Sequence, residues 1–493
     1  MVKTQATNTL STLFSICLLF SLVTSGYADT ERVLIPDMGN QADSSIGPLE
    51  EKRTGEAVIR NIRRAGQIID DPLLENYLNH LGFSLVAVSN TNDRDFRFFM
   101  LNDRDINAFA LPGGFIGVNY GLILAAHSES ELASVLAHEI AHITQRHHAR
   151  VYAMGDRQIP IVAALIAAMI LGANDSEIGE AALATAAAAS VQEQINFTRS
   201  NEKEADRIGI SMLAAAGYSP EAMATFFDRL DQASRLHGPQ APEFLRTHPV
   251  NTSRIADAKN RATQLPKAEM QTESDFHHAR ARIRALAHYN KKTAISEFEK
   301  NLKSGSYQHK EAEQYGYVLA LLRADNHKQA RKIMEPLLAK DPQRIAYIIA
   351  MADIEASSKQ TQKAGEVYRK ALELYPGNKV ITYYYTRYMI DTEQFAKAKE
   401  LLREQMRTPV DFPTLYRLLS RAEAALGNES AAHEAMAEYY YLSGQLHQAI
   451  SQIELAIKTN HKDDFYRTTQ MEAKLQQYQS EIIQPGNQPV MNR

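Results

Sequence analysis

The chain has 493 residues, of which 44% are hydrophobic and 23% are charged, and its formal net charge is −4. This length exceeds what a single hydrophobic core usually organises, so we expect two to four domains. The small net charge and the lack of a long basic run exclude the usual electrostatic signature of nucleic-acid or anionic-membrane binding. The composition therefore predicts a soluble, multidomain protein with no nucleic-acid partner.

Residues 1–28 have the features of a secretory signal peptide. A weakly positive start precedes an apolar run over residues 10–24, and small residues at Gly26 and Ala28 favour cleavage after Ala28. The run is shorter than the ~20 residues that span a bilayer, which makes an uncleaved anchor the weaker alternative. The only cysteine, Cys17, lies in this segment, so the mature chain would contain no disulfide. We therefore predict export to a bacterial periplasm.

A small region of helices and strands is expected after an aperiodic N-terminal arm. Apolar periodicity and turn residues define its elements. In chain order they are the arm over residues 29–45, helices over 50–69 and from Asp71-Pro72 onward, a strand over 96–101, and a hairpin over 107–121 that turns at Pro112-Gly113-Gly114.

The next segment carries the motif His138-Glu139-x-x-His142 on an amphipathic helix. Two histidines four residues apart lie on one helical face, as two zinc ligands require. Glu139 lies beside them, where it can take a proton from water at the metal. Ser128 and Glu131 have the spacing of a capping box at the start of the helix. The segment predicts a zinc site that needs a third ligand.

His148 has the spacing of a third ligand but is a poor candidate. It lies ten residues after His138, and the turn glycine that such an arrangement needs is replaced by Gln145. A continuing helix would carry His148 about 15 Å along the axis, out of reach of the metal. We therefore interpret His147 and His148 as solvated cations at a helix end.

The segment Ser200–Gly209 is the better source of the third ligand. Glu202 and Asp206 share one helical face, whereas Glu204 lies about 200° round from Glu202. One carboxylate could coordinate zinc while the other orients a ligating histidine from behind. Alone, such a stretch is more often a solvated helix face.

At this point the chain resembles a known family. HEIAH, the later Glu-x-x-x-Asp helix and the upstream sequence Asn-Ala-Phe-x-Leu-Pro-Gly-Gly at residues 107–114 are similar to the M48 zinc metallopeptidases. The resemblance implies metalloendopeptidase activity with one zinc ion per subunit. It implies these site residues: His138, His142 and Glu202 as zinc ligands, Glu139 as the general base, and Asp206 behind the ligands.

The same resemblance directs attention to His248 and Arg254. A loop histidine could fill the fourth zinc position and keep the peptidase latent, or it could hydrogen-bond the oxyanion during turnover. Arg254 is expected to contact the substrate, together with Asn107, Ala108 and Phe109. The last three begin a candidate edge strand that could bind substrate backbone by strand addition, although a purely structural hairpin is an equal alternative.

Helices are predicted through the rest of this region. The apolar run 159–171 is too short to span a membrane alone, so it would be a buried helix or an exposed flap. The remaining elements are a long helix from the alanine run 181–189 through Ala216, a helix over 220–236, and a closing helix over 251–262.

The second half of the chain repeats at 34-residue intervals. Ala330, Ala364, Ala398 and Ala432 share this spacing, and each begins the second helix of a predicted pair. The period is that of tetratricopeptide repeats, in which small residues allow close helix approach. Further helices are expected in residues 281–303 and 446–458.

The predicted fold is mainly α: an α+β zincin-like metallopeptidase domain followed by an α-solenoid of tetratricopeptide repeats. The predicted domains are a signal peptide (1–28), an arm (29–45), a peptidase domain (46–262), a linker (263–276), a repeat domain (277–483) and a disordered tail (484–493).

The combination of export signal, M48 domain and repeats resembles a branch of that family acting at the outer membrane. It implies a protease with a chaperone-like role, which helps outer-membrane β-barrel proteins assemble and degrades those that stall. The implied partners are those clients and the assembly machinery, the latter bound through the repeats, with peripheral membrane association left open. The alternatives are a repeat chaperone or adaptor with a structural or latent zinc site, and an integral-membrane peptidase.

Overall fold

A computed structural model describes residues 47–89, 91, 95–147, 150, 188–237, 242–266, 273–287, 290–407, 412–461 and 464–483. The predicted signal peptide, N-terminal arm, apolar run 159–171 and C-terminal tail lie outside the described residues. Among the helices that are described, none is both long and apolar enough to cross a bilayer.

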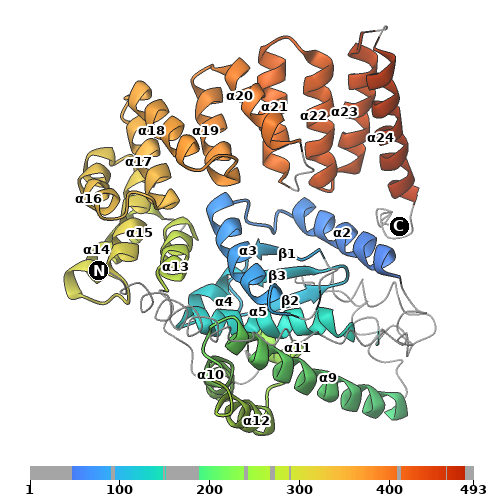
Figure 1. Cartoon of the computed structure of the whole chain (residues 1–493), viewed down its shortest axis with the longest axis vertical. Helices are drawn as coiled ribbons and strands as arrows, with labels where there is room; N and C mark the ends of the chain where they lie inside the picture. The colour runs from blue at the N-terminus through green and yellow to red at the C-terminus, as the bar shows by residue number, and fades with distance from the viewer. Residues whose placement is uncertain are drawn as a thin grey trace, which may run out of the picture. The chain divides into compact units, whose positions relative to one another are not determined.

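A three-stranded sheet and two helices form the first part of the described chain (Figure 1). The middle strand, β3, pairs in parallel with β1 and antiparallel with β2, which confirms the predicted hairpin. Gly113 and Gly114 in its turn have positive φ angles of 80° and 91°, a conformation that side chains rarely adopt. The elements are α2 (Pro48–Arg64), α3 (Pro72–Val86), β1 (Arg97–Leu101), β2 (Ala108–Leu111) and β3 (Phe115–Asn119).

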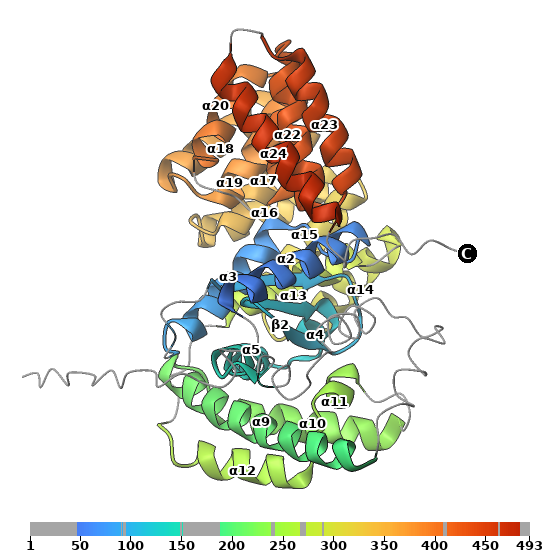
Figure 2. The same cartoon turned by 90° about the vertical axis from the view of Figure 1, so that its right-hand side faces the viewer.

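The motif helix α5 (Glu129–Thr144) lies between the sheet and the helices that follow it (Figures 1 and 2). Its N-terminus is capped as predicted, because Ser128 Oγ accepts the backbone N–H of Glu131. The Glu131 carboxylate accepts the N–H of His127, one residue earlier than in a standard capping box. The neighbouring helices are α4 (Tyr120–Ala125), α9 (Ala188–Ala215), α10 (Glu221–His237), α11 (Glu243–Thr247) and α12 (Thr252–Ala262).

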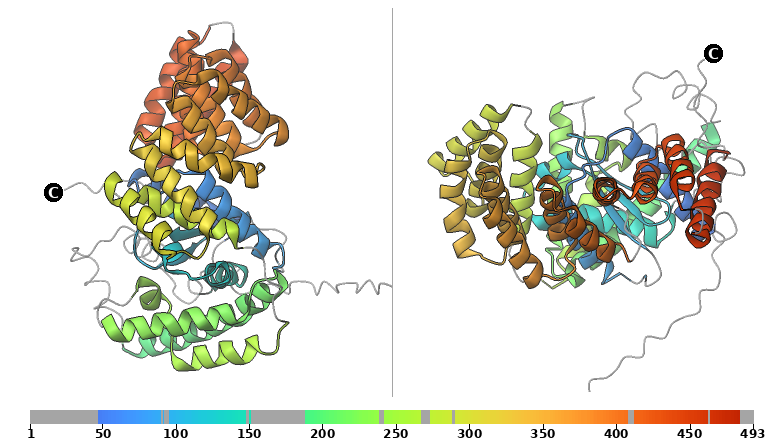
Figure 3. Two further views of the ribbon diagram at one scale, coloured as in Figure 1. Left: turned by 90° about the vertical axis from the view of Figure 1, so that its left-hand side faces the viewer. Right: turned by 90° about the horizontal axis from the view of Figure 1, so that it is seen from above.

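Helices continue through the remaining described residues, and successive helices pack on one another (Figure 3). The four alanines at 34-residue spacing are all buried near the start of a second helix, as predicted. The fold class is therefore confirmed. The helices are α13 (Ser274–Ala287), α14 (Lys291–Ser304), α15 (Lys310–Arg323), α16 (His327–Lys340), α17 (Ile345–Ser357), α18 (Thr361–Leu374), α19 (Lys379–Asp391), α20 (Phe395–Gln405), α21 (Pro413–Ala425), α22 (Glu429–Leu442), α23 (Leu446–Thr459) and α24 (Phe465–Ile483).

The tight turns inside four of these helix pairs share one backbone feature. A residue with a positive φ angle, between 60° and 77°, occurs in each turn at 34-residue spacing: Asp325, Lys359, Glu393 and Gly427. Only the last is a glycine, so three of the turns hold a side chain in the left-handed region.

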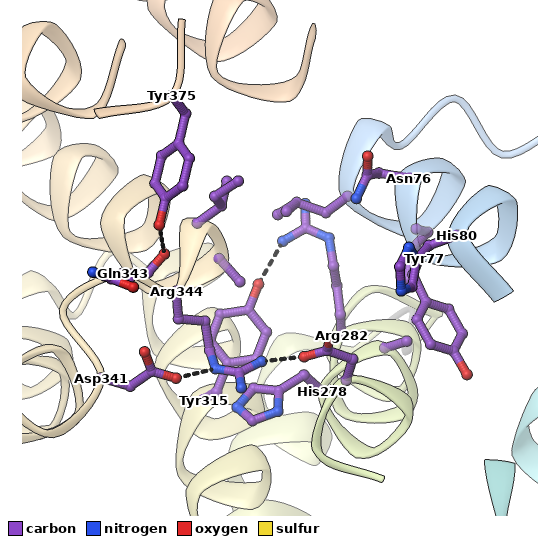
Figure 4. A pocket seen from close by; sticks show the side chains of 16 residues that line it. Asn76, Tyr77, His80, His278, Arg282, Tyr315, Asp341, Gln343, Arg344 and Tyr375 are labelled. Atoms are coloured by element: carbon purple, nitrogen blue, oxygen red, sulfur yellow. Dashed lines mark hydrogen bonds and ion pairs between the residues drawn. The ribbon is translucent and has the colours of Figure 1, made fainter. Parts of the chain in front are cut away.

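Helix α3 contacts the repeat helices through a buried ion pair. The Arg282 guanidinium donates to the Asp71 carboxylate at 2.7–2.9 Å, and also to the Tyr315 and Tyr384 hydroxyls at 3.0 and 2.8 Å. Asp71 also caps α3 by accepting two backbone N–H groups. Figure 4 shows Arg282 and Tyr315 among the side chains that line a cavity of about 370 Å³, which Tyr77 of α3 also lines.

Candidate metal centre

Helix α5 places two imidazoles side by side in the interior. His138 and His142 are one helical turn apart, and their Nε2 atoms lie 3.0 Å from each other. Both side chains are buried. Burial lowers the pKa of His142 well below its usual value, which keeps the imidazole in the neutral form that binds metals.

Helix α9 brings a carboxylate to these imidazoles. A Cβ atom at Gly209 would lie 3.2 Å from the backbone nitrogen of His138, so glycine allows α9 to approach α5 closely. Glu202 Oε2 then lies 3.4 Å from His138 Nε2, and Glu202 Oε1 lies 3.4 Å from His142 Nε2. The predicted third ligand therefore lies next to the two histidines.

A fourth side chain, that of His248, comes from the loop after α11. Its Nδ1 atom lies 3.3 Å from His138 Nε2 and 2.9 Å from Glu202 Oε1. The ring stacks on Phe244, with 4.9 Å between ring centroids. The backbone N–H of Phe244 donates to Ile106, which ties the short helix to the chain just before β2.

These four side chains fit a tetrahedral metal ion. Their ligand atoms all lie within 4.8 Å of one another. Zinc–nitrogen bonds of about 2.0–2.1 Å put tetrahedral ligand atoms roughly 3.3 Å apart, close to the 2.9–3.4 Å separations given above. Burial lowers the pKa of His138, but Glu202 and Asp206 outweigh it and raise that pKa to about 10, so the site favours positive charge.

Glu139 lies next to the cluster without belonging to it. The residue is 1% exposed, and its Oε1 atom has no hydrogen-bond partner among the described residues, although His248 Nε2 lies 3.5 Å from that oxygen. Burial raises the pKa of this carboxyl, while the backbone N–H of Ala110 donates to it. A raised pKa and an unpartnered oxygen suit a group that takes and returns a proton.

Asp206 and Arg254 form a layer behind the ligands. Asp206 Oδ1 lies 3.0 Å from His138 Nδ1, on the ring edge opposite the cluster. The Arg254 guanidinium donates two hydrogen bonds to Asp206, at 2.7 and 2.8 Å, and lies 2.9 Å from Glu202. Arg254 is 3% exposed, and its guanidinium contacts one carboxylate of the cluster, that of Glu202, and the Asp206 carboxylate behind the cluster. A direct contact between Arg254 and substrate remains a prediction.

Strand β2 is an edge of the sheet and packs against α5. The backbone of Asn107 bonds to β3, which leaves the polar backbone groups of Ala108 and the carbonyl of Ala110 on the free edge, while the Ala110 N–H donates to Glu139. Phe109 packs on Phe99 toward α2, so its side chain lies on the other face of the sheet from α5. Pairing of a substrate backbone with this edge, through backbone hydrogen bonds, stays a prediction.

The interpretation of His147 as a solvated helix-end cation is wrong. Its side chain is 3% exposed, and its Nδ1 atom lies 2.9 Å from His142 Nδ1. Helix α5 ends at Thr144, and Arg146 takes a left-handed φ of 52°, which turns the chain back toward the cluster. The sequence contained no glycine to signal this turn. His148 lies outside the described residues.

Comparison with known proteins matches the sequence profile "Peptidase family M48" to residues 72–262. The Beta-barrel assembly-enhancing protease of Escherichia coli (strain K12) is 36% identical over 430 residues, covering 87% of this chain and 88% of that protein. The chain belongs to peptidase family M48. A Vibrio cholerae protein with the name "Putative beta-barrel assembly-enhancing protease" is 37% identical over 86% of this chain and 88% of its own length.

A likeness among solved structures is much weaker. The crystal structure of the yeast Tom70 is 14% identical with a TM-score of 0.28, covering 71% of this chain and 82% of that one. The M48 peptidase described here is therefore a metallopeptidase on the strength of its family and of its His138, His142, Glu202 and His248 cluster.

Proposed function

We propose that this M48 peptidase is a periplasmic zinc endopeptidase that degrades misassembled outer-membrane β-barrel proteins and helps others assemble. The four-residue cluster with Glu139 beside it carries the enzymatic part of the proposal. The similarity to the Beta-barrel assembly-enhancing protease over 88% of that protein supports the client class and the outer-membrane role. The repeat helices offer a surface for clients and for the assembly machinery.

Each residue of the site has a part in the proposed reaction. Zinc, when bound, supplies Lewis acidity toward water and toward the scissile carbonyl. Glu139 takes the proton of the attacking water and returns it to the leaving amine. The free edge of β2 aligns the substrate backbone through the backbone groups of Ala108 and the carbonyl of Ala110, and Asp206 holds the ring of His138 in place.

His248 supports a resting state in which the peptidase is latent. Its Nδ1 atom lies among the ligand atoms, at the position that a catalytic zinc site leaves open. Opening this position requires the loop after α11 to move His248 away. The position of His248 among the ligand atoms also supports a second candidate function, that of a repeat-containing chaperone whose metal site is closed and structural.

The proposed function can be tested directly by zinc analysis and cleavage assays on the full-length mature protein. We expect about one zinc per chain and cleavage of an unfolded outer-membrane β-barrel protein, but not of the same protein folded in detergent. Zinc removal by a chelator should stop cleavage and added zinc should restore it, because zinc held by the cluster would supply the Lewis acidity for hydrolysis. Equal cleavage of an unfolded soluble protein of similar length would contradict the client class. A zinc-loaded protein that cleaves none of them would favour the chaperone.

His248→Ala is expected to raise peptidase activity by roughly tenfold, which corresponds to losing about 1.4 kcal/mol of preference for the closed site. The measurement is the initial rate of client cleavage at saturating zinc. His433→Ala is the control, because His433 is a half-buried repeat residue that hydrogen-bonds Gln452. A tenfold or larger fall in activity would instead assign His248 to the oxyanion.

A further inference from the structure

The two histidine ligands of α5 are supported from behind in different ways. His138 Nδ1 faces the Asp206 carboxylate directly, at 3.0 Å, and Arg254 holds that carboxylate. His142 Nδ1 faces a second imidazole, that of His147, at 2.9 Å. His147 Nε2 in turn lies 3.2 Å from Glu204 Oε2. The support behind His142 therefore contains one more residue than the support behind His138.

The geometry determines which nitrogen atoms carry protons along this chain of contacts. His142 presents Nε2 to the cluster, so Nε2 must be free to bind the metal and Nδ1 must carry the proton. That Nδ1–H donates to His147 Nδ1, which then accepts. His147 accordingly carries its own proton on Nε2 and donates it to Glu204.

Glu204 is also held by a cation, which contacts the same carboxylate oxygen as His147. Arg150 Nη1 donates to Glu204 Oε2 at 3.1 Å. The contacts thus run from Arg150 through Glu204 and His147 to the ligating His142. A shorter series of the same kind runs from Arg254 through Asp206 to His138. Glu204, which lies away from Glu202 on α9, is thereby connected to the metal site through His147.

We infer that His147 is a positioning residue, which with Glu204 fixes the tautomer and ring orientation of His142 for metal binding. The inference rests on the proposed zinc site. Partners behind a ligating histidine typically change metal affinity about 10- to 100-fold when removed. Arg146 takes its left-handed conformation next to this residue, and its ion pair with Glu51, at 3.0 Å, supports the turn that returns His147 to the site.

The inference is tested by measuring zinc binding to the His147→Phe variant of the full-length mature protein. Phenylalanine keeps a ring in the same space but lacks the ring nitrogens. We expect roughly 10- to 100-fold weaker zinc affinity by chelator competition, and a changed visible spectrum of the cobalt(II)-loaded protein. Glu204→Gln, at a partly exposed position, should weaken zinc binding less and leave the fold intact. His433→Phe is the control and should change neither measurement.

The double variant separates positioning from general structural support. Because Glu204 acts on the metal only through His147, adding Glu204→Gln to His147→Phe should cause no further loss of zinc affinity. Additive losses, or unchanged affinity and cobalt spectrum in both single variants, would overturn the inference. If His147→Phe fails to fold, an unchanged affinity in Glu204→Gln alone overturns it. A wild-type protein that binds no zinc would overturn the proposed function instead.

Discussion

Glu139→Gln is expected to lower kcat/KM for client cleavage by about 10²- to 10⁴-fold while the protein keeps its zinc. The amide is almost the same size as the carboxylate but cannot accept the water proton. Glu139 is not one of the four clustered side chains, so zinc content should stay at the wild-type value. The measurements are cleavage rates for an unfolded β-barrel client and metal analysis of the same preparation.

Glu129→Gln is the matched control for that experiment. Glu129 is a buried carboxyl in the same helix, where burial raises its pKa to about 7. It is therefore about half protonated at neutral pH, so the neutral form is already populated, and glutamine can still accept the hydrogen bond from Tyr77. We expect near wild-type cleavage from this variant. A zinc-loaded Glu139→Gln protein that cleaves as fast as wild type would refute the proposed mechanism.

Arg282→Ala should lower the free energy of unfolding by about 3–5 kcal/mol, the usual cost of leaving one partner of a buried ion pair alone. Asp71 is 8% exposed, and its carboxylate would lose all contacts to the guanidinium. Tyr315 and Tyr384 would lose a donor at the same time. Denaturant unfolding followed by circular dichroism measures the loss.

Two further variants show whether the buried charge causes this loss. Arg369→Ala removes an exposed arginine that pairs with Glu373 one turn away, and should cost less than about 0.5 kcal/mol. Asp71→Asn in the Arg282→Ala chain removes the unpaired charge but keeps an oxygen for the cap of α3. We expect it to recover part of the stability. Equal losses in Arg282→Ala and Arg369→Ala would show that the ion pair contributes little.

Local spacing predicted the parts of the site that lie on single helices. His138 and His142 on α5, and Glu202 and Asp206 on α9, are pairs four residues apart, and a helix puts each pair on one face without further information. The same holds for the repeats, because a fixed period makes neighbouring helix pairs equivalent. Family resemblance, rather than spacing, directed attention to His248.

Contacts that depend on a break in a helix, or on distant segments, were not predictable in this way. His147 reaches His142 only because α5 stops and Arg146 reverses the chain without a glycine. Asp71 and Arg282 are 211 residues apart, and each has a local explanation, as a cap or as a surface charge. The parallel pairing of β1 with β3 likewise depends on packing of the whole sheet.

The left-handed turns of the repeats imply that the array flexes in segments. Asp325, Lys359 and Glu393 each hold a side chain in a backbone region that costs about 1–2 kcal/mol, and opening the turn releases that cost. Gly427 adopts the same backbone conformation without this energetic cost. Local opening should therefore concentrate at three evenly spaced hinges in the earlier repeats and spare the fourth turn, so the array should bend in steps of one helix pair.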